Sequence, residues 1–574
     1  MNYPISTNTK NNQKRYITLY WRQFRINWKS FLYDIWIRIT IKIRSINKQG
    51  AAIILSLTAA FLFLINSSTR LDLQGLYYDE LHQATASFAY IGRIPNQIPY
   101  ARLIIDGIPV MNMTYSAAIK SAIYGLYLRV SGAKFSVTSW RLVGILCVSV
   151  ALLLFGLIVR KTLTFVGLFS FYFFMITDLT VLLTTRHDWG PVALALSIRL
   201  LLIATWIRGE LSNDTPAKNS FWLGFMFGIS VFEKLSSIIL IFPIFFMVML
   251  SSKRRNRGHI LASIIGVVIG AIPLIFVNIY SFYHDGVFIS LEQVMGRTYS
   301  ISSLLVLVTN YLSLGAGETA RNFILGKSQH IFSIFELVQI ALIILLMIIV
   351  ISQSMKASNT LRLAGIMLLC YGTIIIGLYF LPQITEIHHW IIGTPFQYSA
   401  IALFLSGLKI KKESFRQGFV VLLVTISFSR LFGLVSVEQS LLRGDATMAW
   451  DPSLPKIGEF TASKSKTAYF IAGDWGVGDQ MICFLNGKPG IVYETFWTEE
   501  GVENAVNAVK NGKRSEVYLV FPKRLFKLTP ETRSIEIQYI ENSLRPAWQE
   551  QSVKGQLARL NSVDVIKLVK TTPP

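Results

Sequence analysis

Charged residues are scarce in this chain, and acidic residues are the scarcest of them. Only 15% of the 574 residues are Asp, Glu, Lys or Arg, whereas 52% are hydrophobic. Because a soluble domain usually carries about 25% charged residues, the composition excludes an ordinary soluble protein and predicts a membrane protein.

Cysteine is also nearly absent. Cys147 and Cys370 lie in apolar stretches, and Cys483 stands alone in the C-terminal part. This distribution implies neither a disulfide framework nor a cysteine metal cluster. A cleavable signal peptide is not visible, because residues 1–50 precede the first apolar stretch. Within this leader, residues 21–32 fit either an amphipathic helix on an anionic membrane surface or a merely basic tail.

What the sequence has in abundance is long apolar runs. Many approach the roughly 20 residues that cross a hydrocarbon core. A chain in lipid must satisfy its own backbone hydrogen bonds, so these runs are predicted to be helices. The predicted fold class is mainly α, a polytopic transmembrane bundle of about eleven spans near 51–67, 140–159, 163–183, 190–207, 221–233, 236–250, 259–278, 334–353, 361–381, 391–408 and 417–435. The short run at 221–233 could form a re-entrant pair with 236–250.

Basic clusters occupy alternate loops of this bundle. The first 50 residues carry ten Lys or Arg, and further clusters lie at 160–161, 253–257, 356–362 and 409–416. By the positive-inside rule these loops and the N-terminus are cytoplasmic, which fits a plasma membrane or bacterial inner membrane. The net charge of +23 is therefore mainly a topology signal. Nothing in the sequence suggests a folded basic surface that reads nucleic acid.

The opposite, extracytoplasmic loops hold nearly all the unusual ionisable groups. These are Asp79-Glu80, Arg186-His187-Asp188, Glu233-Lys234, His284-Asp285 and Glu386 to His389. Two outer stretches, 67–139 and 279–333, are too long for simple loops. Each contains a partly apolar segment, 115–124 and 301–314, which we expect to form an interfacial helix.

After about residue 440 the composition changes. Strands are predicted at 468–472, 490–493, 516–521 and 563–568, with helices at 499–511 and 531–543. We therefore expect a basic cytoplasmic segment over 1–50, a membrane domain over 51–440 and a small extracytoplasmic α/β domain over 441–574. The run from Gly473 to Gly478 fits a dinucleotide fingerprint poorly, and a glycine-rich turn is expected there.

The first outer stretch opens with Tyr77-Tyr78-Asp79-Glu80-Leu81-His82. A pair of carboxylates at a membrane surface is costly to maintain unless something uses it. The pair therefore marks a place where chemistry could occur. A structural alternative is that it neutralises Arg70 or Arg93.

A basic start, one span and then an outer Tyr-Asp-Glu-x-His resembles the GT-C glycosyltransferases, especially the protein O-mannosyltransferases and aminoarabinose transferases. The likeness covers about residues 50–435. Its further elements, in order, are Asp106 to Pro109, Ser139 to Leu142, Thr185 to Asp188, Phe232 to Lys234 and His388 to Pro395. The chain departs from the commoner Arg-x-Asp pattern in having His187 and then Trp189-Gly190-Pro191.

This resemblance implies an enzyme that takes a sugar from a polyprenyl-phosphate carrier. The sugar passes, usually with inversion, to a protein, lipid or glycan acceptor outside the cytoplasm. Asp79 is implied as the base that accepts the proton of the acceptor hydroxyl. Glu80 would orient the acceptor or hold Asp79 by hydrogen bonding.

A departing phosphate needs cations or hydrogen-bond donors where its charge develops. The candidates are Arg186, Lys234, His388 and His389, with His82 as a further substrate-binding residue. Lys234 could instead pair with Glu233. Asp188 could fix the Arg186 guanidinium, touch the acceptor or form a local salt bridge. The adjacent histidines are expected to point apart; no metal is required, although a divalent ion is not excluded.

Three other functional classes are compatible with parts of the sequence. A transporter also has many spans and intramembrane charges, but it should place them near the midplane in interrupted helices. A ligase or polymerase of lipid-linked glycans would share the phosphate-binding groups without needing the early Asp-Glu pair. A receptor or scaffold would leave that pair without a purpose.

Overall fold

The computed structural model describes residues 48–93, 101–212, 217–251, 256–292, 299–326, 330–354, 359–381, 386–408, 413–474, 476–496, 500–523, 529–545, 547–553, 560 and 563–571. The chain divides into two compact units, residues 1–55 and 56–574. The segment predicted at 21–32 and much of the basic clusters at 253–257, 356–362 and 409–416 lie outside the described residues.

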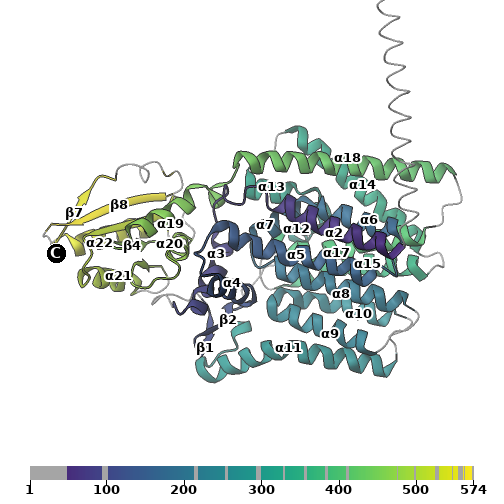
Figure 1. Cartoon of the computed structure of the whole chain (residues 1–574), viewed down its shortest axis with the longest axis horizontal. Coiled ribbons are helices and arrows are strands. Elements are labelled where there is room, and N and C mark those ends of the chain that lie inside the picture. The colour runs from purple at the N-terminus through teal and green to yellow at the C-terminus, as the bar shows by residue number, and fades with distance from the viewer. Residues whose placement is uncertain are drawn as a thin grey trace, which may run out of the picture. The chain divides into compact units, whose positions relative to one another are not determined.

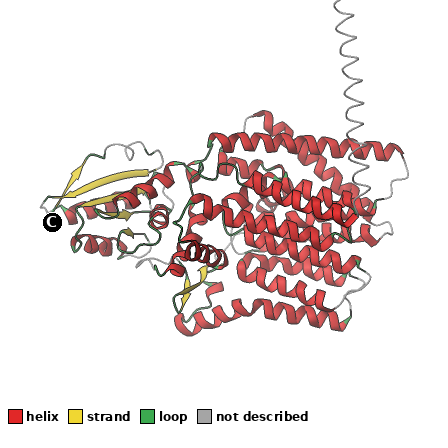
Figure 2. Ribbon diagram, in the orientation of Figure 1, coloured by secondary structure: helices red, strands yellow, loops and turns green. Residues whose placement is uncertain are grey.

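Helices occupy every predicted apolar stretch (Figures 1 and 2). They are α2 (Lys48–Ser67), α5 (Val137–Val159), α6 (Phe165–Ile176), α7 (Leu179–His187), α8 (Ala193–Leu211), α9 (Ala217–Glu233), the 3-10 helix η2 (Leu235–Leu240) with α10 (Ile241–Met249), α11 (Arg257–Asp285), α14 (His330–Ser354), α15 (Asn359–Phe380), α17 (Thr394–Gly407) and α18 (Glu413–Arg443). The predicted helical bundle is therefore confirmed.

Five of the described helices, α2, α5, α11, α15 and α18, are long and apolar enough to cross a membrane. The pair α6 and α7 passes the same test as one broken span, bent by 56° at residues 177–178. The total of about eleven spans remains a prediction for the other helices.

Glycines allow α9 and α11 to pack with their backbones nearly in contact. Gly224 and Gly228 on α9 face Gly266 and Gly270 on α11. A methyl group at Gly270 would lie 2.3 Å from the carbonyl oxygen of Phe225. Small residues four apart on both helices are typical of tight packing in a bilayer, where close approach supplies the van der Waals contact. This packing fixes the C-terminal end of α9, after which Lys234 follows.

The first outer stretch folds into short elements instead of a loop. Helix α3 (Tyr78–Thr85) and the 3-10 helix η1 (Ala86–Ile91) precede a three-stranded antiparallel sheet of β1 (Leu103–Ile105), β2 (Ile108–Met113) and β3 (Ser116–Ala117). Asp106 and Gly107 turn the β1–β2 hairpin with φ of 49° and 78°, as a two-residue hairpin requires.

The segment predicted to be an interfacial helix at 115–124 begins with β3 and continues as α4 (Ile119–Ser131). With 13 residues, α4 is about 20 Å long and too short to span a bilayer. The second such segment, 301–314, is α12 (Ile301–Ser313), also of 13 residues. The short helix α13 (Glu318–Leu325) follows it.

The C-terminal part contains a five-stranded mixed sheet in the order β5-β4-β6-β8-β7. The strands are β4 (Ala468–Ala472), β5 (Val492–Glu494), β6 (Glu516–Pro522), β7 (Trp548–Gln551) and β8 (Val563–Lys570); the helices are α19 (Ser453–Lys464), α20 (Val477–Phe484), α21 (Gly501–Lys510) and α22 (Pro530–Leu544). The predicted strands and helices are present, whereas β7, α19 and α20 are additional. Of the run expected to form a turn, Gly473, Asp474 and Gly476 lie between β4 and α20, whereas Val477 and Gly478 are the first residues of α20.

Two apolar clusters cover the two faces of this sheet. Alternate residues of β4 point to opposite faces, so Phe470 joins α19 and α20 while Ile471 joins α21 and α22. All five residues of β4 are consequently buried, as expected for a central strand between two layers of helices.

Direct hydrogen bonds hold the C-terminal part against the first outer stretch. The Gln480 side chain on α20 donates to the carbonyl of Leu76 at 2.5 Å. The Asn486 side chain accepts from the backbone N–H of Phe135 at 2.7 Å. An apolar cluster that includes Phe88, Phe135 and Cys483 surrounds these bonds. The C-terminal part is thereby fixed to the segment that carries Asp79 and Glu80.

Candidate active site

Asp79 lies in the first turn of α3, at the edge of the helical bundle. Its carboxylate accepts a hydrogen bond from Trp189 and lies close to the charges of Lys234 and Glu386. Burial and the neighbouring Glu386 carboxylate raise the pKa of Asp79 to about 6, although Lys234 opposes this shift. A carboxylate with a pKa near neutrality is suited to accept a proton from a weak nucleophile.

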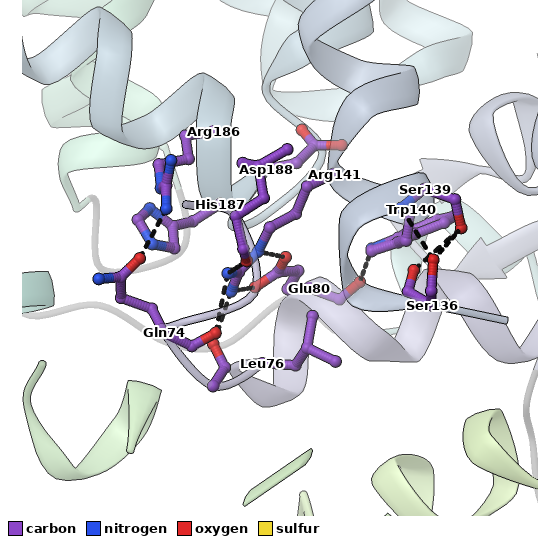
Figure 3. A network of polar contacts seen from close by, with 12 residues as sticks. Gln74, Leu76, Glu80, Ser136, Ser139, Trp140, Arg141, Arg186, His187 and Asp188 are labelled. Carbon is purple, nitrogen blue, oxygen red and sulfur yellow. Dashed lines mark hydrogen bonds and ion pairs between the residues drawn. The ribbon is translucent and has the colours of Figure 1, made fainter. Parts of the chain in front are cut away.

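Glu80 follows Asp79 in α3 and is bound by Arg141 (Figure 3). Arg141 Nε and Nη2 donate to the two Glu80 oxygens at 2.6 and 2.9 Å. The other guanidinium N–H groups donate to the carbonyls of Leu71, Gln74 and Gly75. Both side chains are fully buried, so this ion pair fixes the turn between α2 and α3. The charge opposite Glu80 is Arg141, and neither Arg70 nor Arg93.

Arg186, near the end of α7, is also committed to this turn. Its Nη1 donates to the carbonyls of Ser67, at 3.1 Å, and Thr69, while Nη2 donates to the carbonyl of Arg70 and the side chain of Gln74 at 2.8 and 2.6 Å. Figure 3 shows Arg186 beside Gln74. Arg186 thus holds the chain segment that follows α2. The contact of Arg186 with phosphate stays a prediction.

Asp188 links the interfacial helix to the bundle. One carboxylate oxygen caps α8 by accepting from the N–H groups of Val192 and Ala193, at 2.9 and 2.8 Å. The other pairs with Lys120 of α4 at 2.5 Å, in a buried ion pair. Of the roles considered for Asp188, the structure shows a salt bridge, but to a helix far away in sequence instead of to Arg186.

Lys234 is a single extended residue between α9 and η2. It is buried, and its ammonium group donates to the carbonyl of Gly190. Burial and the positive charge of Arg199 lower the pKa of Lys234 to about 7, while Asp188, Asp79 and Glu233 oppose this change. Asp79 and Lys234 are 155 positions apart in the sequence and were predicted to share a site. The structure shows that they are neighbours.

Arg199, on α8, is a residue that the sequence reasoning missed. It is 1% exposed, and it lies near Lys234 and His389. Its Nε and Nη1 atoms have no hydrogen-bond partner among the described residues. A buried arginine with unpaired donors needs a counter-charge. An arginine inside the apolar run 190–207 is itself a functional signal, and that signal could have identified it.

The two late histidines lie beside Asp79 and Lys234. The ring of His388 lies 4.8 Å from that of Trp189, and the backbone N–H of Glu386 donates to His389 Nδ1 at 3.3 Å. Burial and neighbouring positive charge hold the pKa of both imidazoles well below its usual range, so both are neutral near pH 7.

The expectation that these two rings point apart is wrong. Their centroids are 4.0 Å apart, although they are adjacent residues of the four-residue helix α16 (Ile387–Trp390), which continues directly into a 3-10 turn. His82, by contrast, is held by the backbone of Asn112 in β2, and burial lowers the pKa of His82 to about 4. Its predicted contact with substrate remains a prediction.

Aromatic rings line the space beside Asp79. Tyr77 stacks on Trp450 with centroids 4.8 Å apart, and Trp189 stacks on Phe323 at 4.3 Å. Trp189 also meets both Tyr77 and Trp450 edge to face. Trp450 follows α18, so the chain beyond the bundle supplies one wall of the site. Rigid aromatic walls with a few polar groups are typical of small-molecule sites.

The ion pair of Glu80 with Arg141 and the basic cluster of Arg160 and Lys161 lie at opposite ends of α5. Arg141, in its second turn, binds Glu80, while Arg160 and Lys161 directly follow its last residue. A helix of 23 residues is about 34 Å long, which is enough to separate the two faces of a bilayer. The orientation of these ends with respect to the cell remains a prediction.

Comparison with known proteins establishes the fold. No family model matches the sequence, and no curated protein matches it. Ten solved chains resemble the structure. One is ArnT from Cupriavidus metallidurans bound to undecaprenyl phosphate, with a TM-score of 0.56, 11% sequence identity, and coverage of 90% of this chain and 97% of that chain. The chain therefore has an ArnT-like GT-C fold, as predicted.

The two neighbouring carboxylates should differ in their effect on stability. Glu80→Gln removes the charge opposite Arg141 and leaves that guanidinium buried and uncompensated, at a cost of about 3–5 kcal/mol. Asp79→Asn keeps a hydrogen-bonding group at a site where the charged form is already disfavoured, so we expect little change. Thermal unfolding of the detergent-solubilised variants measures the difference, and equal melting temperatures would contradict it.

Proposed function

We propose that this protein is a membrane glycosyltransferase that moves a sugar from a polyprenyl-phosphate donor to an extracytoplasmic acceptor. The observation that carries the proposal is a cluster of side chains in an ArnT-like fold, in which a carboxylate, Asp79, lies beside a buried cation, Lys234, with Arg199 next to it. The structure of ArnT was determined with undecaprenyl phosphate bound, which supports a donor of this class.

In the proposed reaction, Asp79 is the general base. The acceptor oxygen attacks the anomeric carbon of the sugar while its proton passes to the Asp79 carboxylate. The bond between that carbon and the phosphate oxygen breaks, and its electron pair leaves with the polyprenyl phosphate. Attack from the face opposite the leaving group inverts the anomeric configuration.

The negative charge on the leaving phosphate develops next to Lys234 and Arg199. The unpaired Nε and Nη1 atoms of Arg199 match phosphate oxygens in geometry, and a bound phosphate would raise the pKa of Lys234 above its value of about 7. Neutral His389 can donate or accept a hydrogen bond at the same place. Because these side chains supply the positive charge, the proposed chemistry requires no divalent ion.

The proposed sugar class, acceptor and membrane orientation rest on the sequence. The donor sugar is of the hexose or pentose type, and the acceptor is a protein, a lipid or a glycan. The basic clusters place the N-terminus in the cytoplasm and the Asp79 pocket on the outer side of a plasma membrane or bacterial inner membrane. Glu80, Arg186 and Asp188 would act on the reaction by positioning the elements that carry Asp79 and Lys234.

A transporter is less well supported by the described residues. The broken span α6–α7 is where a midplane binding site would be expected, and it carries the buried carboxylate of Asp178. That carboxylate caps α7 through the N–H of Val181 and accepts from Tyr398, which in turn accepts from Arg430 at 2.8 Å. These contacts stabilise the break internally and leave only Nε of Arg430 without a partner among the described residues, whereas Arg199, beside Lys234, has two such donors.

The direct test is transfer by the Asp79→Asn variant. Purified protein in proteoliposomes is given undecaprenyl-phosphate-linked hexoses and pentoses, and release of undecaprenyl phosphate is measured. Loss of a general base typically lowers the rate by a factor of about 10²–10⁴, while expression and melting temperature stay normal. Near-normal turnover would remove Asp79 from the mechanism.

The rate should also depend on pH through Asp79. Its base form is present above its pKa of about 6, so the rate should fall as the pH decreases through this value. Glu386 raises the pKa of Asp79, so Glu386→Gln should move the acid limb to lower pH. Glu459→Gln, at an exposed position on α19, is the matched control. An acid limb that moves equally in both variants, or in neither, would contradict the assignment.

Donor affinity should depend on Arg199 as well as on Lys234. A hydrogen bond to a charged group contributes about 1.5–3 kcal/mol, so Arg199→Met should weaken binding of undecaprenyl phosphate at least about tenfold. Arg199→Lys should restore part of this loss because it keeps the charge. Isothermal titration in detergent measures the affinities. An unchanged affinity in Arg199→Met would show that the guanidinium has a different counter-charge.

A further inference from the structure

A cavity of about 940 Å³ lies apart from the cluster of Asp79, Lys234 and Arg199. Its walls come from the end of η1 and the following turn, from the C-terminal end of α4 and the turn after it, and from α19 and the end of α20. None of the candidate active-site residues lines it. We call it the basic cavity, because four of its lining residues are Arg93, Arg129, Lys134 and Lys488 and none is Asp or Glu.

The positive charge of the basic cavity is largely uncompensated. Arg93 donates one hydrogen bond, at 3.2 Å, to the carbonyl of Asn486. Arg129, Lys134 and Lys488 form no ion pair within the described part of the chain. Some other surface cations are paired, as Arg102 is with Glu292 at 2.8 Å. Because a concave wall of one charge sign concentrates the field, the cavity favours an anionic ligand.

The walls of the basic cavity are held in place without a ligand. Asn486, whose φ is +52°, turns the chain after α20 and bonds to both Arg93 and Phe135. The rings of Phe135 and Phe484 pack 5.6 Å apart behind it. The cations are therefore presented by two segments that are already joined, and the site is preorganised.

An exposed apolar stripe runs along α4 beside the cavity. It consists of Ile123, Leu126, Tyr127 and Val130, which are 40%, 51%, 42% and 87% exposed. Their spacing of three and four residues places them on one face of the helix. A short helix with such a face is suited to lie in the interface of a bilayer. Arg129 lies between two members of this stripe in sequence and lines the cavity.

We propose that the basic cavity binds the phosphate headgroup of a membrane lipid whose acyl chains lie along the apolar stripe of α4. Uncompensated cations lie next to an apolar helix face, and an amphiphilic anion is the kind of ligand that can contact both. The site would be distinct from the pocket for the sugar donor, and the proposal does not depend on the glycosyltransferase assignment. Inorganic phosphate carries the same headgroup chemistry without acyl chains, so it is the alternative ligand to be tested.

The experiment measures binding of short-chain lipids to the full chain in detergent by isothermal titration. Saturating undecaprenyl phosphate is present throughout. The probes are dioctanoyl phosphatidic acid, dioctanoyl phosphatidylcholine and inorganic phosphate. The test variant is Arg129→Gln/Lys134→Gln/Lys488→Gln. The control variant, Lys456→Gln/Lys510→Gln/Lys513→Gln, removes the same number of exposed charges from the C-terminal part outside the cavity.

We expect phosphatidic acid to bind the natural chain and the control variant, and to bind the test variant at least about tenfold more weakly, since each cation near an anionic lipid contributes appreciably. Phosphatidylcholine and inorganic phosphate should bind much more weakly to the natural chain. Val130→Ser should weaken binding of phosphatidic acid and leave that of inorganic phosphate unchanged.

Several results would overturn the proposal. Equal binding of phosphatidic acid to the test and control variants would show that the cavity cations do not recognise it. Inorganic phosphate binding as tightly as phosphatidic acid would make the site one for a free anion. The test variant should also bind undecaprenyl phosphate normally when that ligand is titrated alone. Loss of this binding would assign the cavity to the donor instead.

Discussion

The buried ion pair of Glu80 and Arg141 is the constraint on which the position of α3, and with it the candidate site, depends. An isolated charge in this environment would cost several kcal/mol, so each partner requires the other to be in place. Because the remaining donors of Arg141 bind three carbonyls between α2 and α3, the pair fixes the entry to α3. Asp79 immediately precedes Glu80, and its position is set by a neighbour that takes no part in the proposed chemistry.

The bundle could be predicted because a long apolar segment in lipid has to satisfy its backbone hydrogen bonds internally, which it does by forming a helix. Strands β4 and β6 could also be predicted from the sequence, since both are short apolar runs rich in β-branched and aromatic residues. The strand β7, with the sequence Trp548-Gln-Glu-Gln, has no such run. It forms because β8 offers it an open edge to pair with, and a long-range cause of this kind leaves no local trace.

The sequence predicted which residues lie together in the candidate site better than it predicted which of them bind each other. Sidedness correctly indicated that Asp79, Lys234 and His389 converge. It could not indicate that Arg141 would take Glu80, or that Arg186 would bind backbone carbonyls instead of facing the pocket. Those partnerships depend on the angle and rotation of each helix, which the hydrophobic pattern does not specify. Arg199 was overlooked because hydropathy averages a single charge into its apolar surroundings.

The stacking of Trp450 on Tyr77 has a consequence for how this architecture can change over time. Trp450, beyond α18, packs on Tyr77, two residues before Asp79, and the turn at Asn486 binds Arg93 and Phe135 of the first outer stretch. The soluble-looking C-terminal portion is thus not an interchangeable module. Recombination that exchanged it between distant homologues would need to carry the matching pieces of the first segment along, so the two regions are bound to evolve together.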